Sequence, residues 1–548
     1  MNKINEQDLL KELRFDIKVR DLLKAKLVLS HIEKVSERTQ KLALFELSRA
    51  EDDFAIPLLA GVIANSPKVS ESFPQLRKTL FSKVLDNPQV VSDLLAAPVE
   101  SSIRGVLAEV AGEIRLKIAV PGLLDILTRE KTPEVIKSVI NALGMIGDPS
   151  AVEAINEYLY AGDNVLIETA ASALSELATP LAVKRLAGRL GTNADLDGLL
   201  IDMLAKIQIP EAIETLNETL ASQSAHLRTA GKQKLGEIGT MSVRILTKNL
   251  LRDNPDLVIH SLNVLGDIGD GAAIPAVRKL LFNEPKDPNI RFAAYETMGR
   301  LPIDKGAYTL AAGLEDPVDN VRSAAAKAID RNFNSVLAAG VRNLTRSADT
   351  DALAIMAAII NAQCDNIVLS LLDEEALIPT VVEYLSQKAH PSIRSHYAGV
   401  LSDSGHNDLA GRLSRRKAIV EKATIKVFAV DDSTMILNIY RTVLHNLGCE
   451  SELFEFPAVA IEKIKKEKPD VVLTDLNMPD ITGIDLTRSV RQHYMKDELP
   501  IIMVTTQDEA KDNRAARDAG VNGILQKPFT EGQIGKALKQ FTGIKTCS

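Results

Sequence analysis

Residues 143–151 read LGMIGDPSA, and close copies of this stretch recur along most of the chain. The clearest copies are LGEIGTMSV, which begins at residue 235, and LGDIGDGAA, which begins at residue 265. Weaker copies begin at residues 111, 174, 204, 298 and 328, so successive copies start 30 to 33 residues apart. A fixed period of this length indicates a repeat protein, in which each repeat is one small unit of secondary structure.

Each repeat is predicted to contain two short amphipathic helices. A polar residue followed by Pro stands about ten residues before several copies, at 132–133, 254–255, 287–288 and 316–317. The polar side chain can accept a hydrogen bond from a free backbone N–H, and Pro at the first helical position loses only a donor that has no partner. A glycine in each clear copy (Gly147, Gly239 and Gly269) permits a left-handed stop or a sharp turn before the second helix.

Short helix pairs cannot bury their apolar faces alone, so the repeats must stack into an α-solenoid. The repeats resemble HEAT repeats, particularly in DPNIRFAA (287–294) and DPVDNVRSAA (316–325). Arg291 and Arg322 within these stretches are expected to form structural pairs in the stack rather than bind a ligand. We predict a helical region of degenerate repeats over residues 1–100, the HEAT-like solenoid over 101–415 and a helical linker over 416–423.

The pattern changes over residues 424–548, where short apolar runs alternate with helical segments. The predicted strands cover residues 425–430, 451–456, 471–475, 501–505 and 523–527. Five strand–helix units in this order indicate an α/β domain with a doubly wound, flavodoxin-like, five-stranded parallel sheet. The predicted fold class is therefore multidomain, with an all-α solenoid followed by this α/β domain.

Polar residues stand where the predicted strands end, and the carboxyl ends of parallel strands gather at one edge of a sheet. These residues are Asp431 and Asp432, Asp475, Thr505 and Lys527. A single acid at such a position most often caps the next helix or starts a turn. Three carboxylates brought together repel one another, however, and a hard divalent cation such as Mg²⁺ would resolve that repulsion.

This segment resembles a response-regulator receiver domain of the chemotaxis type, the phospho-acceptor of two-component signalling. The resemblance is carried by VDDSTM (430–435), TDLNMPD (474–480), MVT (503–505) and KPF (527–529), which occur in the family's order and spacing. It implies that Asp475 accepts the phosphoryl group. It also implies that Asp431, Asp432, Asp475 and the backbone carbonyl of Asn477 hold Mg²⁺, with no other cofactor.

The resemblance assigns three further roles. Thr505 would hydrogen-bond the phosphoryl group, Lys527 would pair with its charge, and the peptide bond before Pro528 would be cis. The family usually has an aromatic residue or His three positions before the lysine, where this chain has Ile524. We therefore expect a switch expressed by shifts near the fourth and fifth strand–helix units, without a swinging ring.

Composition restricts the other classes of function. The net charge of −8, the 4% aromatic content and the absence of Trp disfavour binding to nucleic acid. Three cysteines, far apart and odd in number, indicate neither a disulfide framework nor a zinc site. No apolar run reaches the roughly 18 residues of a membrane span, and acids occupy the first residues, so we expect a cytoplasmic protein.

Together these features predict a two-component phosphorelay response regulator. Its partners would be a cognate histidine kinase or phosphotransfer protein and a protein target on the solenoid surface. It would not be an enzyme, apart from accepting the phosphoryl group and slow autodephosphorylation. Two alternatives stay open at this point: a receiver-regulated, ligand-handling or lyase-like protein, since short HEAT-like repeats also occur in bilin lyases, and a nucleic-acid-binding solenoid.

Overall fold

The structure is a computed structural model that describes residues 5–222, 224–303, 308–347, 349–414, 425–478, 481–505 and 510–542. The chain forms two compact units, an N-terminal unit (Met1–Thr215) and a C-terminal unit (Leu216–Ser548). The predicted linker at 416–423 lies outside the described residues. None of the described helices is both long enough and apolar enough to pass through a lipid bilayer.

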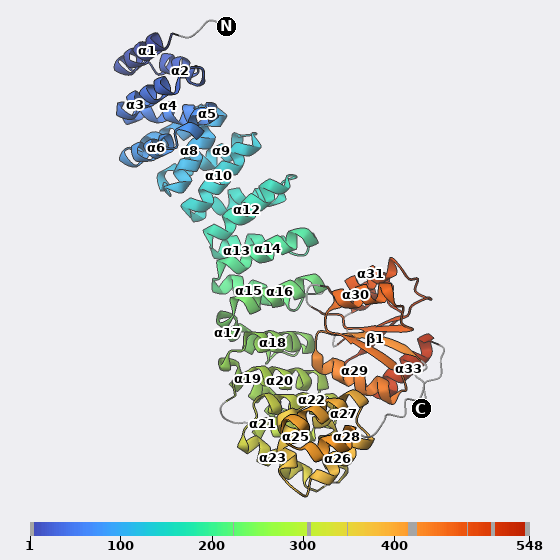
Figure 1. Cartoon of the computed structure of the whole chain (residues 1–548). Helices are drawn as coiled ribbons and strands as arrows, with labels where there is room; N and C mark the ends of the chain where they lie inside the picture. The colour runs from blue at the N-terminus through green and yellow to red at the C-terminus, as the bar shows by residue number, and fades with distance from the viewer. Residues whose placement is uncertain are drawn as a thin grey trace. The chain divides into compact units, whose positions relative to one another are not determined.

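The N-terminal unit consists of stacked short helices (Figure 1). The α-helices are α1 (Glu6–Val19), α2 (Leu22–Leu29), α3 (Glu37–Arg49), α4 (Asp52–Asn65), α5 (Pro67–Ser72), α6 (Gln75–Asp86), α7 (Pro88–Ala96), α8 (Ser101–Glu113), α9 (Val120–Arg129), α10 (Pro133–Ile146), α11 (Val152–Asn156), α12 (Asn164–Leu177), α13 (Pro180–Ala187) and α14 (Ala194–Ile207). The 3₁₀ turns in the described part of this unit are η1 (Ile32–Lys34), η2 (Lys117–Ala119), η3 (Pro149–Ala151) and η4 (Glu157–Tyr160).

The C-terminal unit contains a second stretch of repeats, and α15 (Pro210–Thr219) spans the division between the units. The further α-helices of the repeats are α16 (Ala225–Ile238), α17 (Thr240–Asn249), α18 (Pro255–Ile268), α19 (Ile274–Phe282), α20 (Pro288–Arg300), α21 (Tyr308–Ala312), α22 (Asp319–Arg331), α23 (Ser335–Thr345), α24 (Thr350–Asn361), α25 (Asp365–Leu372), α26 (Ile378–Gln387), α27 (Pro391–Asp403) and α28 (Asn407–Ser414). The 3₁₀ turns are η5 (Gly271–Ala273) and η6 (Gly313–Glu315).

The predicted helix starts and stops can be followed in the caps. Helices α10, α18 and α20 each begin at the predicted Pro, and the Asn254 side chain accepts a hydrogen bond from Leu257 N at 3.1 Å. Gly147 and Gly269 adopt φ of 78° and 69° in the left-handed region after their helices. These angles are accessible to glycine without the steric cost that a side chain would add.

The helix start predicted at 316–317 is wrong by two residues, because α22 begins at Asp319. The Asp316 carboxylate accepts hydrogen bonds from Val318 N and from both Nε and Nη2 of Arg291. Asp316 therefore joins two repeats instead of capping the helix. This contact also confirms the structural role expected of Arg291.

The C-terminal α/β domain contains five parallel strands in the order β2-β1-β3-β4-β5. They are β1 (Lys426–Val430), β2 (Glu450–Phe454), β3 (Val471–Thr474), β4 (Ile501–Thr505) and β5 (Gly523–Gln526). The helices between and after them are α29 (Thr434–Asn446), α30 (Pro457–Lys466), α31 (Gly483–Arg491), α32 (Ala510–Ala519) and α33 (Glu531–Thr542). A solenoid followed by a doubly wound domain confirms the predicted fold class.

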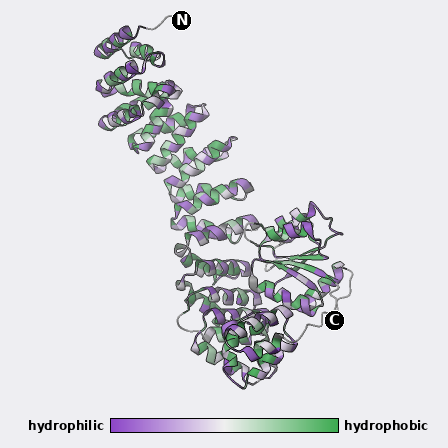
Figure 2. Ribbon diagram, viewed as in Figure 1, coloured by the Kyte–Doolittle hydropathy of each residue, from purple (hydrophilic) through white to green (hydrophobic). Residues whose placement is uncertain are grey.

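Both faces of this sheet are buried, which explains why its central strands are apolar throughout. Helices α29 and α33 cover one face, where Tyr440 and Leu538 pack against Ala429 and Leu473. Helices α30 and α31 lie on the other face against Phe428, and α32 packs there near Met503 through a smaller apolar cluster. Figure 2 shows the strands as a band of hydrophobic residues.

Within the C-terminal unit the α/β domain packs against the repeats through α29. Helix α29 contacts α22 and α24. Phe292 on α20 packs against the apolar cluster that α29 shares with the sheet. The rings of His390, which caps α27, and His445 on α29 meet edge to face with centroids 4.4 Å apart. The α/β domain therefore packs against the repeats at a defined interface.

Candidate functional site

The site is at the carboxyl edge of the sheet, where three strands end in charged residues. Val430 at the end of β1 lies opposite Thr474 at the end of β3. The next residues along these strands, Asp431 and Asp475, are therefore neighbours, and Asp475 N donates a hydrogen bond to Val430 O at 2.9 Å. Lys527 follows β5 and reaches this edge with its side chain.

Lys527 joins the two aspartates directly. Its Nζ lies 2.6 Å from Asp431 Oδ2 and 2.7 Å from Asp475 Oδ1. The other oxygen of each carboxylate accepts a backbone N–H: Asp431 Oδ1 from Ser433 at 3.0 Å, and Asp475 Oδ2 from Asn477 at 2.8 Å. Asp431 is fully buried, and Asp475 and Lys527 are 7% and 8% exposed. Each charged group thus has a fixed orientation.

Burial and mutual charge shift the titration of this cluster. Burial by itself would lower the pKa of Lys527, but the carboxylates of Asp431 and Asp475 outweigh it and raise that pKa well above its usual value. Burial raises the pKa of Asp431, opposed by Lys527 and reinforced by the Asp475 charge. The Asp432 side chain is exposed to a cavity, where the surrounding protein replaces part of the bulk water. This desolvation and the Asp475 charge raise the pKa of Asp432 to about 6.

A glycine fixes the backbone beneath Asp475. Gly483, the first residue of α31, packs so closely that a Cβ there would lie 2.0 Å from Asp475 O. Gly483 N also donates a hydrogen bond to Leu476 O at 2.9 Å, which closes the loop after β3. Sequence reasoning missed this residue, although a Gly eight residues after a strand-end acid was visible as a signal for close backbone approach.

The remaining predicted site residues lie on β4 and β5. Thr505 ends β4 and is buried, and its carbonyl accepts a hydrogen bond from Lys527 N at 2.8 Å. Ile524 is opposite Met503 in the sheet and packs with the apolar cluster beside α32, apart from the charged group. The Lys527–Pro528 peptide bond is cis. The structure thus brings Asp431, Asp475 and Lys527 into contact and leaves Ile524 outside it.

The residues present suit a hard divalent cation. Among the described residues, no three His, Cys, Asp or Glu side chains converge as a ready-made metal cluster, and Lys527 stands between the two closest carboxylates. Mg²⁺ needs only one or two carboxylates, because it retains several waters. Desolvation first, and the Asp475 charge second, raise the pKa of Asp432. Asn477 Oδ1 is buried and accepts no hydrogen bond from the described part of the chain, so it adds a further oxygen at this edge.

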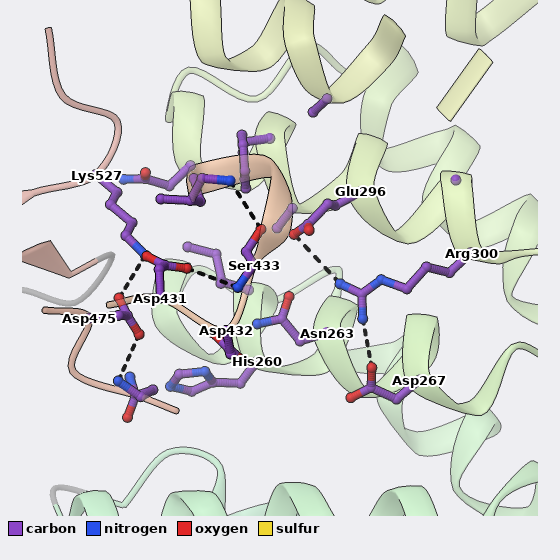
Figure 3. A pocket seen from close by; sticks show the side chains of 18 of the residues that line it. His260, Asn263, Asp267, Glu296, Arg300, Asp431, Asp432, Ser433, Asp475 and Lys527 are labelled. Carbon is purple, nitrogen blue, oxygen red and sulfur yellow. Dashed lines mark hydrogen bonds and ion pairs between the residues drawn. The ribbon is translucent and has the colours of Figure 1, made fainter. Parts of the chain in front are cut away.

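The same edge opens into a cavity of about 720 Å³ that the repeats help to line (Figure 3). The residues from the repeats include Lys232, His260, Asn263, Glu296 and Arg300. Arg300 pairs with Asp267 at 2.6 Å and with Glu296 at 3.5 Å. Sequence reasoning missed all of these, because nothing in a single repeat distinguishes the position that faces the α/β domain.

Comparisons with known proteins agree with this architecture. The family model described as "Response regulator receiver domain" matches residues 427–539, and "HEAT repeats" matches residues 120–197 and 243–330. Chemotaxis protein CheY1 of Helicobacter pylori is 36% identical over 121 residues, which are 22% of this chain and 98% of that protein.

Two further similarities concern sensor proteins. Aerobic respiration control sensor protein ArcB of Escherichia coli is 29% identical over 21% of this chain, and the match spans only 15% of ArcB. The receiver domain of sensor histidine kinase PA1611 from Pseudomonas aeruginosa, solved with a magnesium ion coordinated in its active site cleft, is 24% identical. That match covers 22% of this chain and 98% of the solved chain, with a TM-score of 0.21.

Receiver domains typically bind Mg²⁺ at their active site, and they interact with histidine kinases or phosphotransfer proteins. The CheY1 match covers nearly the whole of that relative, and the edge of the sheet carries the charged residues described above. The chain therefore belongs to the response-regulator receiver family through residues 427–539, and it also carries HEAT repeats.

Proposed function

We propose that Asp475 accepts a phosphoryl group from a phosphohistidine of a cognate histidine kinase or phosphotransfer protein. The observation that carries this proposal is the contact of Lys527 Nζ with both Asp431 and Asp475, at 2.6 and 2.7 Å, at the carboxyl edge of the sheet. A buried lysine held by two acids is poised to pair with further negative charge. The hydrogen bond from Asn477 N keeps the acceptor carboxylate oriented.

The chemistry is an in-line displacement. A carboxylate oxygen of Asp475 attacks phosphorus, the new P–O bond forms as the P–N bond to the donor histidine breaks, and the electron pair leaves with the histidine nitrogen. Catalysis of such a transfer requires positioning and charge neutralisation rather than a general base. Lys527 would neutralise the growing charge, and Thr505 would hydrogen-bond the phosphoryl group.

Asp431, Asp432, Asp475 and the backbone carbonyl of Asn477 would hold the magnesium ion, which neutralises phosphoryl oxygens when it is bound. Beyond accepting the phosphoryl group and slow autodephosphorylation, we assign no catalytic activity to the chain. The proposed setting is the cytoplasm.

The output is a change in how the solenoid, or the surface that it shares with the receiver domain, engages a protein partner. Stacked repeats present long surfaces suited to binding another macromolecule. The packing of α29 on α22 and α24 supports this, because it connects the receiver domain physically to the repeats. Ile524 would take part through repacking of the cluster beside α32.

Treatment of the full chain with acetyl phosphate and Mg²⁺ tests the acceptor. The wild type is expected to gain one phosphoryl group, detected by phosphate-affinity gel and intact mass, and Asp475→Asn is expected to gain none. Asp497→Asn is the matched control, because Asp497 is exposed on the same domain and should leave the reaction unchanged. Equal phosphorylation of the Asp475→Asn protein and the wild type would refute the assignment.

A pull-down tests the output. Wild-type and Asp475→Asn chains, each with and without acetyl phosphate, are used as baits, and the retained proteins are identified. We expect a set of partners whose recovery from the wild type changes on phosphorylation and whose recovery from Asp475→Asn does not. Identical recovery in all four samples would contradict regulation through the solenoid.

A further inference from the structure

The cavity at the acceptor edge is built from two parts of the C-terminal unit. The receiver domain supplies Asp431, Asp432, Asp475 and Lys527, and the repeats supply residues of α16, α18, α20 and α22. Figure 3 shows His260 and Asn263 of α18 on the side of the cavity where Asp432 and Asp475 lie. A phosphoryl group on Asp475 would therefore have side chains of the repeats among its neighbours.

Lys232 on α16 is one of the cations that the repeats contribute to the cavity. It lines the cavity and is half-buried. Burial and the charge of Arg228 lower the pKa of Lys232 to about 8, whereas the nearby carboxylates of Asp475 and Asp432 act in the opposite direction. Within the described part of the chain, no carboxylate lies at ion-pairing distance from Lys232.

Two other cations of the cavity wall, Arg300 and Lys327, have partners within the repeats. Arg300 is held by Asp267 and Glu296, and Lys327 Nζ donates to Gln363 O at 2.9 Å. Glu296 and Asp267 are therefore neutralised in part, so the wall does not simply repel an anion. Lys232 lines the same cavity as Asp475 and has no ion pair among the described residues.

We propose that Lys232 is a ligand for the phosphoryl group on Asp475, so that the repeats and the receiver domain together form one phosphoryl-binding site. This inference deepens the proposed function and rests on Asp475 as the acceptor. A phosphoryl group carries about two negative charges and three acceptor oxygens where the Asp475 carboxylate carried one charge, and these suit the ammonium of Lys232, which lines the same cavity. Phosphorylation would then strengthen the contact of the receiver domain with α16 and α18.

Beryllofluoride, a mimic of a phosphoryl group on a carboxylate, tests this in the full chain with Mg²⁺. Fluorine NMR gives the half-saturating concentration. We expect Lys232→Met to raise it about tenfold, as for loss of one charge-assisted hydrogen bond. Lys232→Arg should stay near the wild type because it keeps the charge. Lys248→Met, on an exposed lysine of α17, is the matched control and should also stay near it.

Amide hydrogen exchange provides a second readout that does not depend on affinity. Beryllofluoride is expected to slow exchange in α16 and α18 of the wild type and to leave them unchanged in Lys232→Met. Circular dichroism melting shows whether Lys232→Met is unfolded. If it is, the comparison of Lys232→Arg with the wild type decides the result.

The outcomes separate the two proposals. If the wild type binds beryllofluoride and Asp475→Asn does not, while Lys232→Met behaves as the wild type in both readouts, the role of Lys232 is refuted and the acceptor is retained. If the wild type and Asp475→Asn behave alike, the acceptor assignment fails, and the role of Lys232 fails with it.

Discussion

At the scale of single residues, the position of Asp475, the proposed acceptor, depends on the absence of a side chain at Gly483 as much as on the charged groups. Gly483 lies beneath Asp475, and a Cβ at this position would be 2.0 Å from Asp475 O. The atom in the way is backbone, which cannot rotate aside as a side chain does. The loop after β3 would have to move, and the carboxylate that Lys527 and Asn477 N hold would move with it.

Gly483→Ala is therefore expected to lower the free energy of unfolding of the receiver domain by about 1–3 kcal/mol, as for overpacking of a tight interior. Phosphorylation by acetyl phosphate should fall as well. Thermal melting and phosphate-affinity gels measure the two effects.

Gly532→Ala is the matched control. Gly532 lies in the first turn of α33, and a Cβ there would meet nothing within 4 Å. Alanine favours a helix over glycine, so this change should be neutral or stabilising by about 0.5–1 kcal/mol. Equal behaviour of the two variants would contradict the close approach of Gly483 to Asp475.

At the scale of elements, the stack is held by contacts between successive repeats as well as by apolar packing. Arg291 on α20 reaches Asp316, just before α22, through two hydrogen bonds of 2.7 and 3.1 Å. Arg291 Nη1 also donates to Pro285 O at 2.7 Å. The Arg291 and Asp316 side chains are only 16% and 8% exposed, so removal of the arginine leaves an acid that water cannot fully solvate.

Arg291→Met is expected to destabilise the C-terminal unit by about 3 kcal/mol, because breaking one side of a buried pair leaves an uncompensated charge. Arg346→Met is the control. It removes the arginine of the pair with Glu374, in which Arg346 is 63% exposed, and should cost less than about 1 kcal/mol. Urea unfolding followed by circular dichroism compares them, and equal costs would show that Arg291 does not hold the stack together.

At the scale of the whole molecule, the sequence predicts what depends on local periodicity and on strand order. The period of 30 to 33 residues predicts the solenoid, and the charged strand ends predict that Asp431, Asp475 and Lys527 meet. Neither signal specifies where the receiver domain rests on the repeats. Lys232 is more than 190 residues from Asp431 in the chain, and nothing in the sequence of its repeat indicates that the two residues line the same cavity.

The domain limits predicted at residues 100, 415 and 423 stay predictions. The compact units divide at Thr215, within the predicted solenoid, because compactness reflects packing density and need not follow the repeat boundaries. The helix start at 316–317 was wrong for a related reason: the Asp316 carboxylate is used by a neighbouring repeat, which a single repeat does not reveal.

The contact between the receiver domain and the repeats includes the rings of His390 and His445, so we expect the strength of this contact to depend on pH. Burial, with added effects of His445, Arg441 and Arg394, lowers the pKa of His390 to about 4 from a usual value of 6.5. Burial also lowers the pKa of His445. Between pH 6.5 and 4, the state in which the receiver domain is separated from the repeats therefore binds more protons than the state in which the two are in contact. By linkage, the contact weakens as pH falls through this window and is strongest above it.

Amide exchange in α29 of the full chain should consequently be slow at pH 7.5 and should accelerate at pH 5, after correction for the intrinsic pH dependence of exchange. The double variant His390→Asn, His445→Gln removes both titrating rings and should lose most of this acceleration. Asn can still cap α27, where His390 Nδ1 now accepts a hydrogen bond from Ser392 N at 3.1 Å. An equal acceleration in the double variant would assign the pH dependence to other groups of the interface.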